Sequence, residues 1–232
     1  MQIFMIIGGF QKFSLIDFPE RTSSIVFTQG CPFRCAYCHN PELIPLKKEG
    51  LDKQEILCYL KKEQKLIDGV CVTGGEPTIH EGLEVFIREL KEMGFAVKID
   101  TNGIRPDVVS RLIHVKLIDY VAMDLKHVWE KYSDVIRIRG EDIVNRCKET
   151  FSLLQTSGIA HEFRTTIFPA VHTQKDFFTM AGYLKNGEKY FIQETGFKKN
   201  FDPAISRDIG FDAEVLAADL REAFPHLSIA LR

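Results

Sequence analysis

Three cysteines fall within eight positions of one short stretch, Gly30 to Pro41, which reads GCPFRCAYCHNP. Cys31, Cys35 and Cys38 have the spacing C-x3-C-x2-C, and a histidine follows the last of them. Thiolates are the preferred ligands of soft metal ions and of iron–sulfur clusters, and three of them so close together rarely lack a ligand. We therefore predict a metal centre at this stretch.

The stretch has four possible interpretations: three kinds of metal centre, and a set of thiols that bind no ligand. A structural zinc site needs four ligands and could recruit His39, but no second pair of cysteines follows. Residues Cys35 to His39 satisfy CxxCH, the pattern of covalent haem attachment, yet this leaves Cys31 without a role. An iron–sulfur cluster on three thiolates would use all three cysteines and would keep one iron open for a substrate or cofactor.

The composition is that of an ordinary globular protein. Its 232 residues are 45% hydrophobic and 27% charged with a net charge of -2, so the overall balance suggests neither nucleic acid nor an anionic membrane as a partner. The apolar start, MQIFMIIGGF, is too short for a membrane span and has no basic residue, so we expect a cytoplasmic protein. The other cysteines are single residues in apolar stretches and are predicted to be buried: Cys58, Cys71 and Cys147.

Strand-like and helix-like segments alternate along the chain. The predicted strands are residues 24–28, 69–77, 95–103, 120–126, 161–169 and 189–196. The predicted helices are residues 51–66, 80–93, 106–113, 143–156 and 175–184. Six βα-type units in succession mean parallel strands joined by right-handed crossovers, in a doubly wound sheet or in a complete or partial barrel. We predict one α/β domain over residues 1–232, with a C-terminal extension, 198–232, packed on it that holds a helix around 213–224 and a final edge strand.

Every predicted strand ends in a distinctive group of polar or glycine residues. The groups are TQGC, TGGEP, DTNG, MDLK, RTTIFP and QETG. A single group of this kind would be ordinary punctuation after a strand. Because the carboxyl ends of parallel strands meet at one face, we expect all six groups to surround a common site.

The cysteine spacing, on a loop after the first parallel strand, resembles that of radical S-adenosylmethionine enzymes. The resemblance implies a [4Fe–4S] cluster bound by the three cysteines, with the amino and carboxylate groups of S-adenosylmethionine on the open iron. It also implies that a glycine-rich motif after the second strand holds the methionine ammonium group. Gly74, Gly75 and Glu76 match that motif.

The same resemblance assigns roles at the later strand ends. The positions concerned are Asp100, Asn102, Asp124, Lys126, Arg164 and Gln193. Asp100 and Asn102, at the end of the third strand, would contact cofactor or substrate; the alternative is a plain Asn-Gly turn. Asp124 and Lys126, the DxK element at the end of the fourth strand, would do the same; the alternative is a salt-bridged strand end. Arg164 would pair with the cofactor carboxylate or with a partner's terminus; the alternative is a structural role as a hydrogen-bonding fork.

Residues 13–44, FSLIDFPERTSSIVFTQGCPFRCAYCHNPELI, closely resemble the anaerobic ribonucleoside-triphosphate reductase activating proteins. Glu20 departs from the pattern, because the family usually has glycine there. The resemblance implies a partial (βα)6 TIM-like barrel with an open mouth, a protein substrate that receives a glycyl radical, and a flavodoxin- or ferredoxin-type reductant. Alternatives are activation of another glycyl-radical enzyme such as pyruvate formate-lyase, a small-molecule radical enzyme such as a 7-carboxy-7-deazaguanine synthase, and a non-catalytic iron–sulfur electron-transfer protein.

Overall fold

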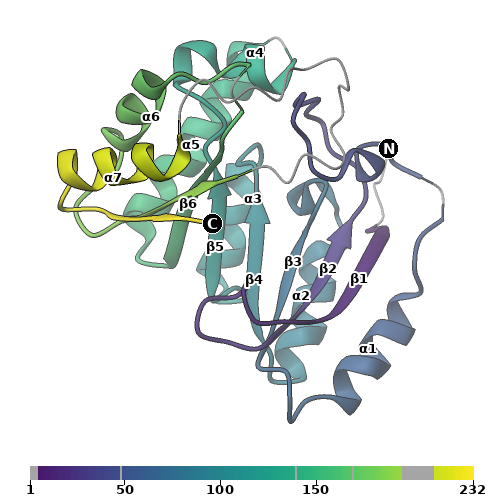
Figure 1. Ribbon diagram of the computed structural model, residues 1–232. Helices are drawn as coiled ribbons and strands as arrows, with labels where there is room; N and C mark the ends of the chain where they lie inside the picture. Colours follow the sequence, from purple (N-terminus) through teal and green to yellow (C-terminus); the bar gives the residue numbers. More distant parts are fainter. Residues whose placement is uncertain (1–4, 48, 139, 169, 195–211) are drawn as a thin grey trace.

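The computed structural model describes residues 5–47, 49–138, 140–168, 170–194 and 212–232. Its strands form one sheet of eight, side by side in chain order (Figure 1). Strands β2 to β8 are parallel, and β1 pairs antiparallel with β2. The strands are β1 (Ile7–Ser14), β2 (Ser23–Thr28), β3 (Gly69–Gly74), β4 (Ala96–Thr101), β5 (Tyr120–Asp124), β6 (Ala160–Thr166), β7 (Lys189–Gln193) and β8 (Ser228–Leu231).

Helices connect the parallel strands, and Figure 1 shows α2 and α3 behind the central strands. The α-helices are α1 (Lys53–Lys62), α2 (Leu83–Glu92), α3 (Pro106–His114), α4 (Tyr132–Ile136), α5 (Glu141–Ser157), α6 (Gln174–Ala181) and α7 (Ala213–Ala223). Short 3-10 turns are η1 (Pro41–Leu43), η2 (Pro77–Ile79) and η3 (Trp129–Lys131). None of the helices in the described ranges is long and apolar enough to cross a bilayer.

The two faces of the sheet have different chemistry, as β4 illustrates. Val97 and Ile99 are fully buried in the main hydrophobic core. Side chains alternate along a strand, so Lys98 and Asp100 lie on the opposite face. That face is polar and carries the groups described below.

The predicted α/β fold with parallel strands is confirmed from β2 to β7, and the predicted final edge strand is β8. The prediction missed β1, because its sequence IGGFQKFS has two glycines and no clear alternation. Over the described part of the chain, β1 and β8 have one strand neighbour each, so the sheet is an open partial barrel. The predicted start of the C-terminal extension, at 198, lies outside the described residues.

The last described segment is tied into the sheet by a buried ion pair. Arg232, after β8, places its Nη1 2.9 Å from Oε1 of Glu162 on β6, and the Glu162 side chain is fully buried. Tyr120 on β5 donates its hydroxyl to the other oxygen of Glu162, at 2.9 Å. Ionic and hydrogen-bonding groups thus replace apolar packing on the inner face at this level of the sheet.

The burial prediction for the single cysteines is confirmed for two and wrong for one. Cys71 and Cys147 are buried, but Cys58 is exposed. Cys58 lies on α1, whose buried residues are Ile56 and Leu60. On a helix of 3.6 residues per turn, position 58 therefore lies off the buried stripe despite its apolar neighbours in the sequence.

Glu20, which stands where the resembling family usually has glycine, has a positive backbone φ of 62°. A side chain in this left-handed region costs roughly 1–2 kcal/mol, whereas glycine adopts it freely. Glu20→Gly is therefore expected to raise the free energy of unfolding by up to about 1 kcal/mol, after the added entropy of the unfolded chain is subtracted. Urea denaturation with an unchanged slope would measure this. Glu81→Gly, at a residue without positive φ, serves as the control and is expected to give no gain.

Candidate functional site

A cavity of about 270 Å³ lies at the carboxyl ends of strands β2 to β7. All the site residues predicted from the sequence line it: Cys31, Cys35, Cys38, Gly74, Gly75, Glu76, Asp100, Asn102, Asp124, Lys126, Arg164 and Gln193. They come together because every parallel strand ends at the same edge of the sheet. The expected common site is therefore present in the fold.

The cysteine-bearing loop after β2 is held by main-chain hydrogen bonds. Cys31 donates its backbone N–H to the carbonyl of Ile44, at 3.1 Å. The backbone N–H of Cys38 donates to the carbonyl of Cys35, at 3.1 Å, and so closes a turn between the last two thiols. Cys35 is buried, whereas the other two cysteines are half-buried. The backbone rather than the thiols fixes this loop, which leaves the sulfur atoms available as ligands.

The thiols fit an iron–sulfur cluster better than a single metal ion. Burial raises the pKa of Cys31 to about 12 and that of Cys35 to about 11, so a bound metal would have to displace their protons. In the described ranges, no three His, Cys, Asp or Glu side chains converge closely enough to hold one ion. The three cysteines instead border one cavity, which the remaining cysteines do not line: Cys58, Cys71 and Cys147. Three thiols without a fourth would leave one iron of a cubane open.

The glycine-rich turn after β3 is fastened directly to the start of the cysteine loop. The backbone N–H of Glu76 donates to the carbonyl of Gly30, at 2.9 Å, and that of Gly75 donates to the carbonyl of Thr28, at 2.8 Å. A Cβ added at Gly75 would lie 2.2 Å from the Gly30 carbonyl oxygen. Only glycine permits this approach of two backbones. The turn and the loop therefore form one rigid unit.

Glu76 is completely buried and joins the ends of β3 and β4. Its Oε1 accepts from the backbone N–H of Thr78 (3.0 Å) and from the hydroxyls of Thr78 (2.5 Å) and Thr101 (2.8 Å). Its Oε2 accepts from the backbone N–H of Asn102, at 2.7 Å. Burial raises the pKa of this carboxyl, and the hydrogen bonds oppose that effect. Each carboxylate oxygen offers about two acceptor positions, and Oε2 receives only the Asn102 N–H, so Oε2 keeps acceptor capacity on the cavity that Glu76 lines.

Glu76→Gln is expected to lower the free energy of unfolding by about 1–3 kcal/mol. The new amide nitrogen must face at least one donor that now points at a carboxylate oxygen, which leaves a buried N–H or O–H group without an acceptor. Chemical denaturation monitored by circular dichroism measures the loss. Glu81→Gln, at an exposed residue, provides the matched control and should change stability by less than about 0.5 kcal/mol. Equal stability of the two variants would contradict the role given to Glu76.

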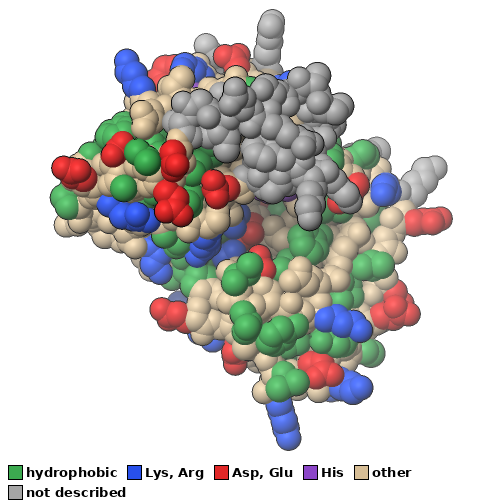
Figure 2. Space-filling view, in the orientation of Figure 1, with side chains coloured by type: hydrophobic (Ala, Val, Ile, Leu, Met, Phe, Trp, Pro, Cys, Tyr) green, Lys and Arg blue, Asp and Glu red, His purple; other side chains and the backbone are tan. Residues whose placement is uncertain are grey.

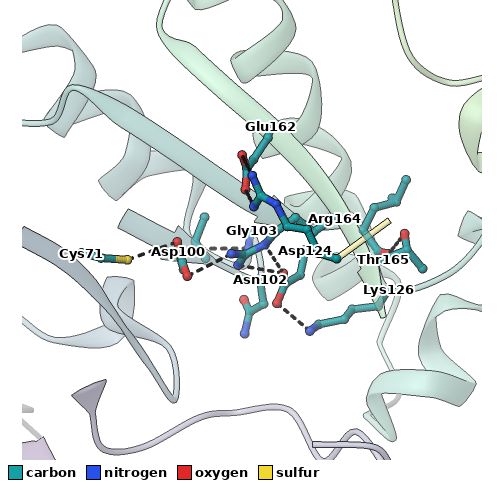
Figure 3. A network of polar contacts seen from close by, with 12 residues as sticks. Cys71, Asp100, Asn102, Gly103, Asp124, Lys126, Glu162, Arg164 and Thr165 are labelled. Atoms are coloured by element: carbon teal, nitrogen blue, oxygen red, sulfur yellow. Dashed lines mark hydrogen bonds and ion pairs between the residues drawn. The ribbon is translucent and has the colours of Figure 1, made fainter. Parts of the chain in front are cut away.

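A chain of alternating charges crosses the inner face from β4 to β6 (Figure 3). Arg164 lies at its centre, with Nη1 3.0 Å from Oδ2 of Asp100 and Nη2 3.0 Å from Oδ1 of Asp124. Lys126 contacts the other oxygen of Asp124, at 2.8 Å, and Lys98 pairs with Asp100. The salt-bridged strand end that was the alternative for the DxK element is therefore present. The paired residues Asp124, Lys126 and Arg164 still line the cavity. Their ion pairs therefore do not exclude a role in binding a ligand.

The network keeps its carboxylates ionised. Burial by itself would raise the pKa of Asp100, but the cations of Arg164 and Lys98 outweigh it and hold that pKa below the usual range. Burial also acts against ionisation of Asp124, and Lys126 and Arg164 lower its pKa in the same way. The network holds three cations and two anions, and two of these cations, Lys126 and Arg164, line the cavity. An anionic group entering the cavity would find its partners in these two side chains.

Sequence reasoning missed two residues that hold the backbone of the DxK element. The Tyr132 hydroxyl donates to the carbonyl of Asp124 at 3.2 Å and accepts from the backbone N–H of Lys126 at 3.4 Å. His172 accepts the backbone N–H of Phe168 on Nδ1 (3.0 Å), so its Nε2–H donates to the Lys126 carbonyl, at 2.8 Å. Burial lowers the pKa of His172 to about 4, which keeps it neutral at physiological pH. A lone histidine in a loop gives no sequence signal for such a contact.

Further residues also line the cavity. From the sequence, Phe33 and Tyr37 are expected to shield a cluster, and both are buried in the wall, with the Tyr37 ring 5.1 Å from that of Phe168. His39 and Asn40, expected near the cluster or cofactor, line the cavity as well. The remaining lining residues are Asp17, Phe27, Ile44, Thr73, Thr101 and Thr166. Asp17 belongs to the connection between β1 and β2. The only sequence feature that pointed to Asp17 was the motif FSLIDFP, which contains it.

Comparison with known proteins finds a family and several relatives. A family model described as the radical SAM superfamily matches residues 25–176. A putative glycyl-radical enzyme activating enzyme of Methanocaldococcus jannaschii is 36% identical over 205 residues, which cover 87% of this chain and 85% of the relative. A pyruvate formate-lyase-activating enzyme of Staphylococcus aureus is 32% identical over 187 residues, or 72% of each protein.

Solved structures share the fold at low sequence identity. SuiB of Streptococcus suis, bound to S-adenosylmethionine, superimposes with a TM-score of 0.66 and 13% identity, over 87% of this chain and 48% of SuiB. The chain thus spans about half the length of that protein. QueE of Escherichia coli superimposes with a TM-score of 0.56 and 16% identity, over 100% of this chain and 92% of QueE. At these identities the likeness concerns the fold alone.

Proposed function

Because this chain belongs to the radical SAM superfamily, whose members use a [4Fe–4S] cluster and S-adenosylmethionine, we propose that it is an activating enzyme that generates a glycyl radical on anaerobic ribonucleoside-triphosphate reductase. The observation that carries the proposal is the single cavity that three thiols, a glycine-rich turn and a charged network line together. Relatives named as glycyl-radical enzyme activating enzymes support the reaction. The resemblance of residues 13–44 supports the choice of reductase.

Each part of the cavity has a proposed role toward the cofactors. The three cysteines would hold three irons of the cluster. The Gly74–Gly75 turn and Oε2 of Glu76 would meet the ammonium group of S-adenosylmethionine, because Oε2 keeps acceptor capacity on the cavity. Arg164 and Lys126, as the positive side of the network, would face its carboxylate, while the polar side chains at the ends of β4 and β5 would contact the rest of the molecule.

The protein contributes binding, orientation and exclusion of water. When bound, the cluster and the cofactor supply one-electron cleavage of the sulfonium and abstraction of a hydrogen atom from a glycine Cα. The rigid unit formed by the cysteine loop and the Gly75 turn would hold the bound cluster and cofactor in a fixed relation to each other. The buried rings of Phe33 and Tyr37 keep solvent away from the thiols. We propose a flavodoxin- or ferredoxin-type protein as the source of the electron.

A second candidate partner is pyruvate formate-lyase. The observation that favours it is the 32% identity with the activating enzyme of Staphylococcus aureus that carries this name. The same cavity would serve either partner, because the acceptor in both is a glycine Cα. The choice between them therefore rests on surfaces outside the cavity.

Anaerobic reconstitution with iron and sulfide tests the proposal in two stages. The first stage adds dithionite and S-adenosylmethionine and measures 5′-deoxyadenosine, which we expect to form. The second stage adds purified anaerobic ribonucleoside-triphosphate reductase or pyruvate formate-lyase and records electron paramagnetic resonance spectra. A glycyl signal on the reductase is the expected result.

The outcomes separate the candidates. A loaded protein that never cleaves the cofactor would contradict the enzyme and favour an electron-transfer role. A glycyl signal on pyruvate formate-lyase alone would replace the preferred partner by the second candidate. Cofactor cleavage with no glycyl signal on either protein would leave a radical SAM enzyme whose substrate is not one of these two, and the activating function would be wrong.

A further inference from the structure

Lys98, in the middle of β4, is a lysine in the interior of the protein. Lysine normally keeps its ammonium group in water, and Figure 2 shows lysine and arginine side chains at the surface of the molecule. Only 1% of the Lys98 side chain is exposed, and Lys98 does not line the cavity. Burying an ammonium group is costly unless a partner compensates for the lost water, so the contacts of Lys98 indicate what its charge does.

The ammonium group of Lys98 serves Asp100. Its Nζ pairs with Oδ1 of Asp100, two residues further along the same face of β4, and lies 3.6 Å from Sγ of Cys71 on β3. Burial raises the pKa of the Cys71 thiol well above its usual range, so the thiol stays neutral. Burial by itself would lower the pKa of Lys98, but the Asp100 carboxylate outweighs it and raises that pKa. Lys98 therefore stays charged, and Asp100 is the anion that it balances.

Asp100 connects this buried lysine to an arginine on the cavity, as Figure 3 shows. While Oδ1 of Asp100 faces Lys98, its Oδ2 lies 3.0 Å from Nη1 of Arg164. Arg164 also contacts Asp124, through Nε at 3.1 Å and Nη2 at 3.0 Å. A guanidinium group has five N–H donors, so some remain for a ligand in the cavity that Arg164 lines.

The net charge that Arg164 presents to such a ligand depends on both lysines of the network. Lys126 offsets the charge of Asp124, and Lys98 offsets that of Asp100. Without Lys98, two aspartates would balance the two remaining cations, and an anion entering the cavity would meet a neutral network. In a buried site of low dielectric constant, one unit of charge changes the affinity for an anion substantially.

On the basis of the proposed function, in which Arg164 faces the carboxylate of S-adenosylmethionine, we propose that Lys98 is a positioning residue for this cofactor. Lys98 neutralises Asp100 and so leaves the positive charge of Arg164 to the cofactor carboxylate, which Lys98 itself does not touch. A residue with this role acts on the affinity for the cofactor and not on the rate of its cleavage.

Lys98→Met in the full-length, cluster-loaded protein removes the charge and keeps most of the side-chain volume. Isothermal titration calorimetry of the anaerobic, oxidised protein measures the affinity for S-adenosylmethionine. The rate of 5′-deoxyadenosine formation with dithionite, recorded against cofactor concentration, gives the half-saturating concentration and the maximal rate. Lys53→Met is the matched control, because it changes the net charge equally. Lys53 pairs with Glu89 at 2.8 Å, is 36% exposed and does not line the cavity.

We expect Lys98→Met to weaken cofactor binding about tenfold or more, as is usual for coupling between groups that do not touch. The half-saturating concentration should rise by the same factor at an unchanged maximal rate, and the control should match the wild type. Thermal unfolding checks the fold of the variants. A folded Lys98→Met protein with wild-type affinity would overturn the proposal, since a merely structural lysine lowers stability alone. Lys98→Gln, whose amide can still donate to Asp100, replaces Lys98→Met if that variant does not fold.

The double variant Lys98→Met with Asp100→Asn tests whether Lys98 acts through Asp100. It removes both charges of the pair, so the network keeps its original net charge, and binding should recover most of what Lys98→Met loses. A double variant that binds no better than Lys98→Met would contradict the proposed role. These measurements use no partner protein. The absence of a glycyl radical on both candidate partners would therefore contradict the proposed function and not the role of Lys98.

Discussion

Cys35→Ala is expected to abolish assembly of the [4Fe–4S] cluster and reductive cleavage of S-adenosylmethionine with it. Cys35 is the buried member of the three cavity cysteines, and the other cysteines of the chain do not line the cavity. Two remaining thiolates cannot hold three irons of a cubane. The loss of cleavage activity should exceed the roughly 10–100-fold loss that follows when a contact to a metal ligand, rather than the ligand itself, is removed.

Iron content, visible absorption and yield of 5′-deoxyadenosine after anaerobic reconstitution measure this effect. Cys58→Ala provides the matched control, because Cys58 is exposed on α1 and does not line the cavity. It should retain wild-type iron content and cleavage. A Cys35 variant that keeps a full complement of iron would show that another group serves as the third ligand.

Arg164→Met is expected to lower the free energy of unfolding by about 3–5 kcal/mol at neutral pH. Methionine keeps most of the side-chain volume but removes the cation that two buried carboxylates share. Asp100 and Asp124 would each retain one lysine partner, Lys98 and Lys126, and would face each other across the vacated space. Urea denaturation measures the difference.

The loss should depend on pH in a defined direction. In the wild type, the pKa values of Asp100 and Asp124 lie below their ordinary range, chiefly because Arg164 and the lysines outweigh burial. Carboxylates with lowered pKa values stabilise the fold above their unfolded pKa, near 4, and this contribution is lost as pH falls below it. The difference between Arg164→Met and the wild type should therefore be largest near pH 7 and should shrink below about pH 4.

Arg88→Met is the appropriate comparison. Arg88 pairs with Glu84 at 3.0 Å on the surface of α2, with about half of its side chain exposed. An exposed pair of this kind contributes less than about 1 kcal/mol. If both arginine variants lost the same small amount, the buried network would not stabilise the fold in the way its geometry indicates.

The residues that carry local chemistry could be predicted from the sequence. The spacing of Cys31, Cys35 and Cys38 lies within one loop, and the Gly74–Glu76 motif within one turn, so neither needs a distant contact to be recognised. Strand periodicity then placed the loop and the turn at one edge of a parallel sheet. The α/β fold class and the strand-end residues that line the cavity could therefore be predicted, because the carboxyl ends of parallel strands all lie at the same edge of the sheet.

The partners of these residues could not be predicted in the same way. Arg164 reaches an aspartate 64 positions earlier in the chain, and Lys98 gave no signal beyond its place on an apolar strand. Tyr132 and His172 act on the backbone of the DxK element, which no side-chain pattern reveals. The strand β1 was not predicted, because its pairing with β2, rather than its own sequence, makes it a strand.

The sequence by itself therefore determined most of the groups that surround the site, since short spacings and strand ends are properties of neighbouring residues. Only the tertiary structure decided how those groups are charged and held. Strand register sets Asp124 opposite Arg164, and burial makes each charge depend on its partner. The tertiary structure also brought Asp17 to the cavity and left Leu15 and Ile16 exposed, because these positions depend on how the chain crosses the sheet.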